Sequence, residues 1–461
     1  MGFSDKYSNT FRKLLPAPFT IALILTIFVF LLSIFFGKGS SFDSSTNRLI
    51  QTTEFWYNGL WNSDGLSFTV QMMLMLLLGH VLALSKPIDQ LLNKLSSFCT
   101  DNAKAAFYIT FFTISFAFIN WGLGLIFGAL FARKIAEQST KLNIKINYGF
   151  IGACGYVGMM VWHGGLSGSA PIKVADKEHL SKLMDGVELN GTLPDAIPMS
   201  ETVFSSMNIS VGLALLIILP VLMFWLGRKI NTHAVSLPKT LISSESEEES
   251  IGFEKADQSI IFGKVIGSLF LFYTLYKIYD SSEIATLGFL TPNFINFSLI
   301  GLCLLMHKSI FTFLGAIDQA IGGVSGILIQ FPLYYGIMGI MKDAGLMSSV
   351  AEYISSIATD QSFPILTLMS SGALNVLVPS GGGQWIVQGP ILIETAINND
   401  ISLSKTVMAM SYGDQLTNMM QPFWALPLLA ITGLKAKEIL PYTLLLMGAG
   451  LIIFTTALII F

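Results

Sequence analysis

Charged residues are scarce in this sequence. Lys, Arg, Asp and Glu together make up 12% of the 461 residues, whereas hydrophobic residues make up 52%. A soluble domain usually carries about twice that share of charge, so the composition argues against a soluble protein. The formal net charge of −3 supplies no basic face, and we therefore expect no nucleic-acid partner.

Cysteines are few and enzyme motifs are missing. Cys99, Cys154 and Cys303 are odd in number and widely spaced, which excludes a disulfide framework and a regularly spaced metal site. The sequence contains no HExxH, Gly-x-Ser-x-Gly or Walker motif. Ser167 follows Gly165 and Leu166 like a nucleophile, but no histidine–acid pair accompanies it in a known order. We expect neither an enzyme nor a cofactor.

The chain instead contains long apolar runs. Residues 18–36, 202–226 and 440–461 carry no charge, and about 20 such residues span the ~30 Å hydrocarbon core of a bilayer. The first run is too long for a cleavable signal, so we interpret it as a retained helix. Full or broken spans are predicted near 17–36, 67–85, 148–171, 202–226, 262–280, 290–307, 322–341, 405–431 and 438–460.

Two further apolar stretches, 105–131 and 363–396, are interrupted at their centres. The first contains Asn120-Trp121-Gly122, and the second contains Val378-Pro379-Ser380 followed by three glycines. Glycine and proline unwind a helix, and the freed backbone groups must then face protein or a wet cavity. We predict a re-entrant hairpin at each stretch. The alternative, a single kinked span, would reverse the topology downstream.

The distribution of basic residues favours the hairpins. With the N-terminus in the cytoplasm, the predicted cytoplasmic loops hold 17 Lys and Arg, and the external loops hold 7. The C-terminus is then expected to be external. Residues 227–261 contain the acidic, serine-rich run 243–250 and are predicted to be a disordered cytoplasmic linker between residues 1–226 and 262–461.

The two halves repeat each other. Tyr156 follows Asn120 by 36 residues, and Tyr412 follows Asn375 by 37. Pro171 and Pro427 each lie 15 residues after these tyrosines. We therefore predict an all-α polytopic membrane protein of two inverted-topology repeats, each with a re-entrant hairpin and a broken helix (148–171 and 405–431). Matching interrupted helices are typical of transport sites.

These motifs have a family resemblance. They comprise residues 119–124, 165–171, 378–390 and 412–427, which include Gly381-Gly382-Gly383 and Gln421-Pro422. With these motifs, the chain resembles the bacterial short-chain fatty acid transporter (AtoE) family over nearly its whole length. The resemblance implies symport-type uptake of acetoacetate, butyrate and similar monocarboxylates. It also implies the inner membrane of a bacterium and membership of the ion-transporter superfamily, whose members look like elevator carriers. The chain departs from the pattern that the resemblance implies, which has Glu at the position of Asp414 and His at the position of Gln384. The first departure leaves the coupling ion open.

The carboxylate of such a substrate must meet backbone dipoles, because no Lys or Arg lies deep in the predicted hairpins or broken spans. A half-helix N-terminus offers free N–H groups and about half a positive charge. We expect two such binding positions for the carboxylate, although the glycines could instead serve only to allow tight packing of helices. The expected substrate-binding residues are Ser167, Gly168, Ser169, Ser380, Gly381, Gly382, Gly383 and Gln384.

A coupled cation, Na⁺ or H⁺, would drive uptake. Asn120 and Asn375 are expected at the two hairpin tips as Na⁺ ligands, although each could merely cap a helix. Asp414 is an intramembrane carboxylate that could bind Na⁺, take a proton, or be structural. Asn418 and Gln421 could complete the shell.

Other expectations concern aromatic residues, histidines and the class of carrier. An apolar pocket for the alkyl tail could involve Trp121, Trp162, Trp385, Phe423 and Trp424. An interfacial position is favoured for His80, and His163 could sense substrate or pH. A cation/proton antiporter or a di- or tricarboxylate carrier remains the alternative function, and a homodimer is possible.

Overall fold

A computed structural model describes residues 17–38, 42, 47–185, 189, 191–235, 257–281, 289, 291–357, 359 and 362–461. Within these residues the protein is helical and has no strand; Ile146 and His233 form one isolated bridge. Among the described residues, seven helices are long and apolar enough to cross a membrane. The prediction of an all-α polytopic membrane protein is confirmed to this extent.

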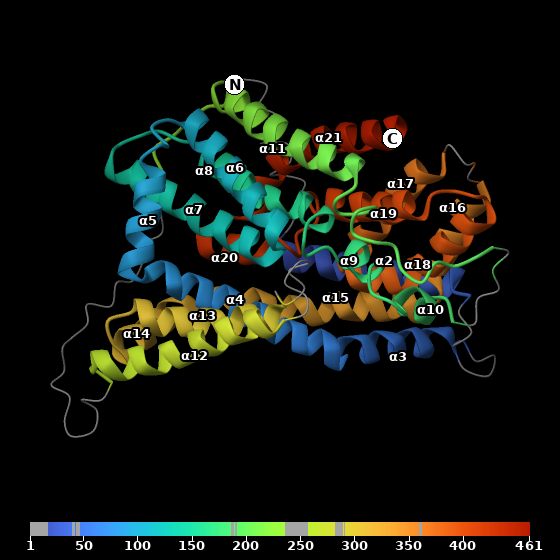
Figure 1. The fold of residues 1–461 in the computed structure, drawn as a ribbon, viewed down its shortest axis with the longest axis horizontal. Coiled ribbons are helices and arrows are strands. Elements are labelled where there is room, and N and C mark those ends of the chain that lie inside the picture. The colour runs from blue at the N-terminus through green and yellow to red at the C-terminus, as the bar shows by residue number, and fades with distance from the viewer. Residues whose placement is uncertain are drawn as a thin grey trace.

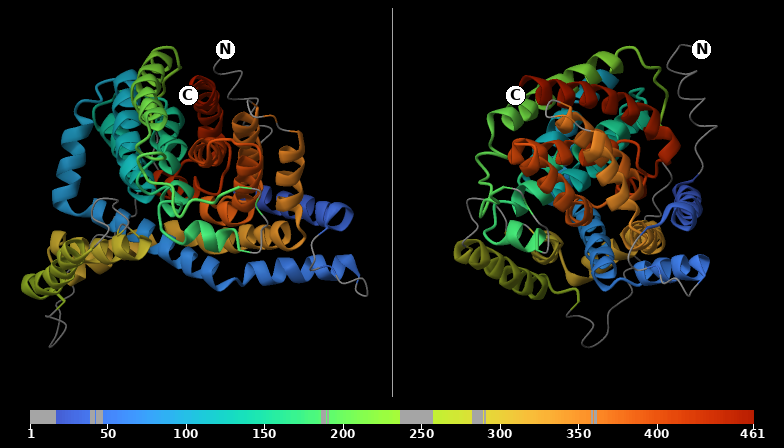
Figure 2. Two further views of the ribbon diagram at one scale, coloured as in Figure 1. Left: turned by 45° about the vertical axis from the view of Figure 1, so that its right-hand side comes forward. Right: turned by 90° about the vertical axis from the view of Figure 1, so that its right-hand side faces the viewer.

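The helices form a lower layer and an upper body (Figures 1 and 2). The helix α4 crosses α15 in the lower layer; α2 and α3 pack on α15, and α13 and α14 pack on α4. A Cβ atom on Gly59 would lie 2.4 Å from the Tyr335 main-chain oxygen, so this glycine permits close approach of α3 to α15. The lower layer comprises α2 (Pro18–Phe36), α3 (Arg48–Leu60), α4 (Ser63–Leu84), α12 (Ile260–Asp280), α13 (Pro292–Met306), α14 (Ile310–Ala320), the 3₁₀ helix η4 (Ile321–Val324) and α15 (Ser325–Asp343).

The upper body holds the interrupted segments. The arms α6 and α7 pack along each other, whereas α17 and α18 both pack on α19. Two connecting helices, α5 (Lys86–Ser96) and α16 (Leu346–Ile357), follow α4 and α15. The upper body comprises α6 (Asn102–Ile119), α7 (Trp121–Lys141), α8 (Tyr148–Tyr156), η1 (Val157–Met160), η2 (Trp162–Gly164), α9 (Ser169–Lys173), α10 (His179–Leu183), α11 (Ser206–Gly227), α17 (Phe363–Leu377), α18 (Gly381–Asn398), α19 (Leu403–Thr417), α20 (Leu426–Thr432) and α21 (Ala436–Ile460).

Both predicted interruptions are present. Asn120 adopts extended backbone angles and ends α6 while capping α7. Pro379 pushes the preceding Val378 out of the helical region, and α17 accordingly ends at Leu377. Ser380 then caps α18. The broken spans also appear, since α8 passes into 3₁₀ turns and α19 is separated from α20.

Several segments predicted as loops are helical. The helices α3, α5 and α16 fall in the expected loops 37–66, 86–104 and 342–362, and α14 starts the predicted span 322–341 twelve residues early. The helix α7 continues past the predicted boundary at 131 to Lys141. Its charges are compensated there, because Arg133 pairs with Glu137 at 3.1 Å and Lys134 pairs with Asp89. These helices mix polar and apolar residues, so a search for apolar runs misses them.

The segment 163–201, which includes the end of the predicted broken span 148–171, is also structured in part. It contains α9 and α10, which pack on α18. Ala170, Val174 and Leu180 share a buried apolar cluster with Trp385 and Leu392. The segment therefore covers the second hairpin. Most of the predicted linker 227–261, namely residues 236–256, lies outside the described residues.

Candidate functional site

A cavity of about 350 Å³ lies where the interrupted segments meet the lower layer. The break before α7 contributes Trp121, and the break before α18 contributes Ser380. The cavity therefore borders both helix breaks. Its lining comprises Asn62, Asp64, Gly65, Phe68, Trp121, Trp162, Ser169, Tyr335, Met338, Pro379, Ser380, Gly381, Gly382, Phe423 and Trp424.

The N-terminus of α18 opens into this cavity. The first-turn N–H groups of a helix have no acceptor within the helix. Ser380 satisfies one of them, because its Oγ accepts a hydrogen bond of 3.2 Å from the Gly383 N–H. Gly381 and Gly382 line the cavity at the same helix end. The positive end of the α18 dipole thus faces a space in which no described lining residue is Lys or Arg.

The glycines of this turn differ in what surrounds them. A Cβ atom on Gly381 would lie 2.7 Å from Cε1 of His163 and 3.0 Å from Cη2 of Trp162, so tight packing explains this glycine. A Cβ atom on Gly382 would meet nothing closer than Ser169 Oγ, at 3.7 Å. Gly382 is therefore the position at which the backbone is open to a ligand.

The break before α7 is tied to the first broken span. Asn120 Oδ1 accepts hydrogen bonds from the N–H groups of Gly122 and Leu123, at 2.9 and 3.2 Å. Ser167 Oγ accepts a 2.9 Å hydrogen bond from the Trp121 N–H. Asn120 therefore acts as a helix cap, and Ser167 holds the tip in place. Neither lines the cavity, whereas Ser169 does.

A buried pair joins the two broken spans. His163 Nδ1 lies 2.5 Å from Asp414 Oδ2, and both side chains are buried. His163 Nε2 accepts a 3.2 Å hydrogen bond from the Ala170 N–H. A backbone N–H only donates, so Nε2 carries no proton and the ring proton is on Nδ1, where it donates to Asp414. His163 is consequently a neutral imidazole whose Nδ1–H donates to Asp414 Oδ2.

No Lys or Arg side chain of the described residues pairs with Asp414. The Oδ1 atom of Asp414 is buried and has no hydrogen-bond partner among the described residues. A buried, unpaired carboxylate oxygen is costly, and it fits a site for a cation.

Asn375 lies beside Asp414 and, like it, has a buried side-chain oxygen without a hydrogen-bond partner among the described residues. Its Nδ2 donates to the Asp414 main-chain oxygen at 2.8 Å and to Asn418 Oδ1 at 2.9 Å. Its Oδ1 is buried and, within the described chain, has no partner. Asn418 Nδ2 in turn donates to the Met159 main-chain oxygen at 3.0 Å. The second hairpin is thereby connected to both broken spans.

The two asparagines do not occupy equivalent positions. Asn120 caps α7, whereas Asn375 lies within the last turn of α17, and Ser380 is the residue that caps α18. The prediction of both asparagines at hairpin tips is therefore right for Asn120 and wrong for Asn375. Ser380 is the counterpart of Asn120 as a cap.

The remaining predicted residues lie away from the cavity lining. Gln384 lies between the arms of the second hairpin, where Nε2 donates to the Ser371 main-chain oxygen at 2.9 Å. Gln421 Oε1 accepts a 2.9 Å hydrogen bond from the Phe423 N–H. A Cβ atom on Gly168 would lie 2.1 Å from the His163 oxygen, which indicates a packing role. Gly383 lines an adjoining cavity of about 270 Å³.

Aromatic rings form one wall of the cavity. Trp121 and Trp424 meet edge to face with centroids 5.2 Å apart, and Phe68 lies 6.2 Å from each. Trp162 stacks on His163 at 4.5 Å. Trp385 is outside the cavity, because its indole donates to His179 Nε2 at 2.9 Å. Such a wall suits a short alkyl chain.

Sequence reasoning missed the lower-layer half of the lining. Asn62 comes from the break between α3 and α4, and Asp64 and Phe68 come from the first two turns of α4. Tyr335 and Met338 come from α15. Asn62 caps α4 by accepting from the Gly65 N–H at 2.8 Å, and this local Asn-x-x-Gly signal could have indicated the helix start. No sequence signal indicates that the break faces the hairpins.

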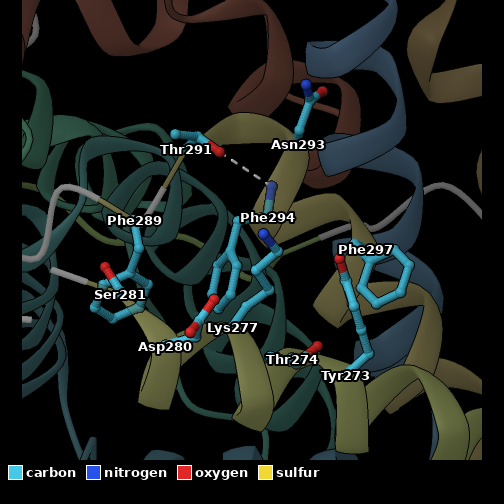
Figure 3. Close-up of a pocket in the computed structure, with 10 residues that line it drawn as sticks. All are labelled: Tyr273, Thr274, Lys277, Asp280, Ser281, Phe289, Thr291, Asn293, Phe294 and Phe297. Atoms are coloured by element: carbon cyan, nitrogen blue, oxygen red, sulfur yellow. Dashed lines mark hydrogen bonds between the residues drawn. The ribbon is translucent and has the colours of Figure 1, made fainter. Parts of the chain in front are cut away.

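Another cavity, of about 430 Å³, lies at the ends of α12 and α13 (Figure 3). Its charged residues are Lys277 and Asp280, and Thr291 Oγ1 accepts from the Phe294 N–H. None of the predicted site residues lines it. The candidate functional site is therefore the cavity at the helix breaks.

Comparisons with known proteins point to one family. A model of the family described as "Short chain fatty acid transporter" matches residues 3–461. A protein of Escherichia coli strain K12 is 33% identical over 458 residues, which cover 97% of this chain and 96% of the relative. A protein of Haemophilus influenzae Rd is 33% identical over 448 residues, or 95% of each chain. Both are named, provisionally, for short-chain fatty acid transport.

Solved structures resemble the chain only distantly. The Alcanivorax borkumensis YdaH transporter matches with a TM-score of 0.44 and 13% identity, over 96% of this chain and 98% of that chain. Neisseria gonorrhoeae MtrF, described among antimetabolite efflux pumps, matches with a TM-score of 0.38 and 13% identity, over 95% and 94%. Similarities at this level carry no argument about the site.

Proposed function

The chain belongs to the short-chain fatty acid transporter family, and from this premise we propose that it takes up acetoacetate, butyrate or similar monocarboxylates by symport with Na⁺. It is a transporter and not an enzyme. The observation that carries the proposal is the cavity between the hairpin breaks, with the unpaired oxygens of Asp414 and Asn375 nearby.

The substrate carboxylate would bind at the N-terminus of α18. The Ser380 hydroxyl and the open backbone at Gly382 supply donors, and the helix dipole adds about half a positive charge. The alkyl chain would lie against Trp121 and Trp424. A volume of about 350 Å³ is at the small end of ligand pockets, which suits a short acid.

The class of substrate follows from the charges. A di- or tricarboxylate would place further negative charge in a cavity whose described lining contains Asp64 and no basic side chain. The dipole of one helix end cannot balance several charges. The alternative of a cation/proton antiporter leaves the aromatic wall without a role. We therefore favour a monocarboxylate carrier over both alternatives.

Na⁺ would serve as the second transported species. Asp414 and Asn375 offer a carboxylate and an amide oxygen without donors, which are the hard ligands that such ions prefer. Asn418 would position Asn375, and His163 would hold Asp414 through Nδ1. The side-chain oxygens of Asn120 and Gln421 already accept hydrogen bonds from backbone N–H groups. These two residues would therefore stabilise the surrounding backbone and would not bind the ion directly.

Alternating access by an elevator movement is part of the proposal. Lower-layer helices of each half pack on a helix of the other half. The helices α2 and α3 of the first half pack on α15 of the second, and α13 and α14 of the second half pack on α4 of the first. This reciprocal packing supports an inverted repeat. The lower layer would be the scaffold, and the hairpins with their broken spans would move. The connecting helices α5 and α16 would link the scaffold to the moving part.

The setting of the carrier is also proposed. The protein is a multi-pass membrane protein, and we propose the bacterial inner membrane with a cytoplasmic N-terminus and an external C-terminus, from the distribution of Lys and Arg. A homodimer is proposed by analogy with elevator carriers in general, and light scattering of the detergent-solubilised protein would test it.

Reconstituted transport tests this proposal. Proteoliposomes containing the purified protein should accumulate labelled butyrate above its external concentration when an inward Na⁺ gradient is imposed, and succinate should not compete. A proton gradient imposed alone should give equilibration only. Concentrative uptake driven by the proton gradient and indifferent to Na⁺ would overturn the choice of ion. Na⁺/H⁺ exchange without butyrate uptake would overturn the function.

A further inference from the structure

A groove of about 620 Å³ lies at one end of the lower layer, away from the transport cavity. The end of α4 with the start of α5, the start of α12, and the junction of α13 with α14 enclose it. Lys86, Lys264 and Lys308 line it, one from each of these places. The groove thus gathers basic side chains that are far apart in sequence.

These three lysines are uncompensated. All are exposed, and within the described residues none forms an ion pair. The described lining of the groove contains no Asp or Glu. By contrast, the cavity of Figure 3 carries one charge of each sign, Lys277 and Asp280.

Two carboxylates close in sequence to the groove, those of Asp89 and Asp257, lie outside its described lining. Asp89 on α5 is engaged by Lys134 of α7 and accepts a 2.9 Å hydrogen bond from Asn93. Asp257 precedes α12, and its main-chain oxygen accepts from the Phe311 N–H at 2.9 Å. His307 in the lining is directed away, since its Nε2 donates to the Val81 main-chain oxygen at 3.0 Å.

The level of the lysines in the membrane is fixed by the helices that carry them. Lys86 and Lys308 each follow the last residues of a lower-layer helix, α4 and α13. Lys264 is four residues into α12, about 6 Å from its start. Ends of spanning helices lie at the headgroup level, where a lysine can bind a phosphate while its stem stays apolar.

An apolar surface adjoins the charges. Leu84, Ile260, Leu305 and Met306 line the groove, and Ile261 on α12 is 74% exposed. The helix α12 buries only Gly263, Gly267 and Thr274, so its remaining face is open to the bilayer. Phosphate binding at one end with an apolar face beside it is the shape of a phospholipid.

We infer that this groove binds the headgroup phosphate of an anionic phospholipid, such as phosphatidylglycerol, with an acyl chain along α12. Each lysine near a membrane surface contributes about a fivefold gain in anionic-lipid binding. The three together should distinguish an anionic from a zwitterionic lipid, whose own cationic group cancels this attraction.

Native mass spectrometry of the detergent-purified protein tests the inference. Wild type should bind phosphatidylglycerol at least about tenfold more tightly than phosphatidylcholine, and inorganic phosphate should not compete. A variant with Lys86→Gln, Lys264→Gln and Lys308→Gln should lose this preference. A control with Lys94→Gln, Lys141→Gln and Lys145→Gln, also exposed and outside the groove, should keep it.

Three results would overturn the inference. They are equal binding of both lipids by wild type, equal losses in the two triple variants, and displacement by free phosphate at lipid-equivalent concentration. If the triple variant misfolds, Lys264→Gln alone, on the exposed face of α12, should weaken phosphatidylglycerol binding about fivefold, and an unchanged affinity would count against the site. Binding that appears only after Glu245, Glu247, Glu248 and Glu249 are changed to Gln would identify the acidic run as the occupant.

Discussion

Ser380 is the side chain that the account places closest to the substrate carboxylate. Ser380→Ala removes the cap of α18 and a hydroxyl donor, each worth about 1 kcal/mol. We expect the KM for butyrate uptake to rise about fivefold to tenfold with little change in maximal rate, measured in proteoliposomes. Ser380→Thr keeps the hydroxyl and should restore most of the affinity.

A matched control separates binding from helix capping. Ser402 caps α19 in the same way, by accepting from the Lys405 N–H at 3.3 Å, but it does not line the cavity. Ser402→Ala should therefore reduce stability by a similar amount and leave the KM unchanged. If both variants raise the KM equally, Ser380 acts only as a cap.

At the same scale, the sequence could identify some residues and not others. Asp414 is recognisable because a carboxylate in an apolar span is rare and functional by default. Its partner His163 is not recognisable, since the two residues are 251 positions apart and nothing in the sequence between them indicates a contact. Gln384 seemed to belong to the glycine turn, but its position along α18 turns the amide toward α17.

Among the elements, the segment with α9 and α10 covers α18 through a titratable contact. Trp385 donates to His179 Nε2, which requires a neutral imidazole. Burial lowers the pKa of His179 below its ordinary 6.5, and the charge of Lys173 adds to this effect while Asp176 opposes it. A lowered pKa stabilises the folded state fully above pH 6.5, and this contribution is lost as the pH falls through the folded value.

Thermal unfolding should reveal this contact. Wild type should lose about a degree or two of Tm more than His179→Gln between about pH 8 and about pH 5, because glutamine can accept from Trp385 without titrating. Parallel pH profiles for the two proteins would show that the His179–Trp385 hydrogen bond does not stabilise the segment.

Elements were predictable where one local signal dominates. The helix breaks at Asn120 and Pro379 follow from capping and from the restriction before proline, and both are present. The amphipathic helices α3, α5 and α16 were not predicted, because their polar residues interrupt the apolar run. Their stability comes from packing; α3, for instance, lies against α15, and only the assembled layer reveals it.

For the whole molecule, the account requires the second hairpin to move against the lower layer. A Cβ atom on Gly383 would lie 3.0 Å from Cε of Met338 on α15. A double variant, Met338→Cys with Gly383→Cys, should be bridged by mercuric ion. Transport should fall to background on bridging and recover with excess dithiol. The native cysteines Cys99, Cys154 and Cys303 are buried, which favours selective bridging.

Each single variant provides the control for this experiment. Mercuric ion should leave transport by either single variant near its untreated rate. Full transport by a bridged double variant would contradict an elevator movement between α15 and the second hairpin.

The whole architecture was only partly accessible from sequence. Composition predicted a helical membrane protein, and the spacing of Asn120, Tyr156 and Pro171 against their counterparts predicted paired halves. The meeting of both breaks over Phe68 and Tyr335 depends on how the two layers pack, and no local pattern encodes that contact.

Reciprocal binding tests the central claim most directly, because two species bound in one carrier must each raise the affinity for the other by the same factor. Titration calorimetry of butyrate into the purified protein should give a Kd at least about tenfold lower in Na⁺ than in choline, or about 1.4 kcal/mol of coupling. Asp414→Asn should abolish this difference while preserving weak butyrate binding. An equal Kd in Na⁺ and choline for wild type would contradict the account.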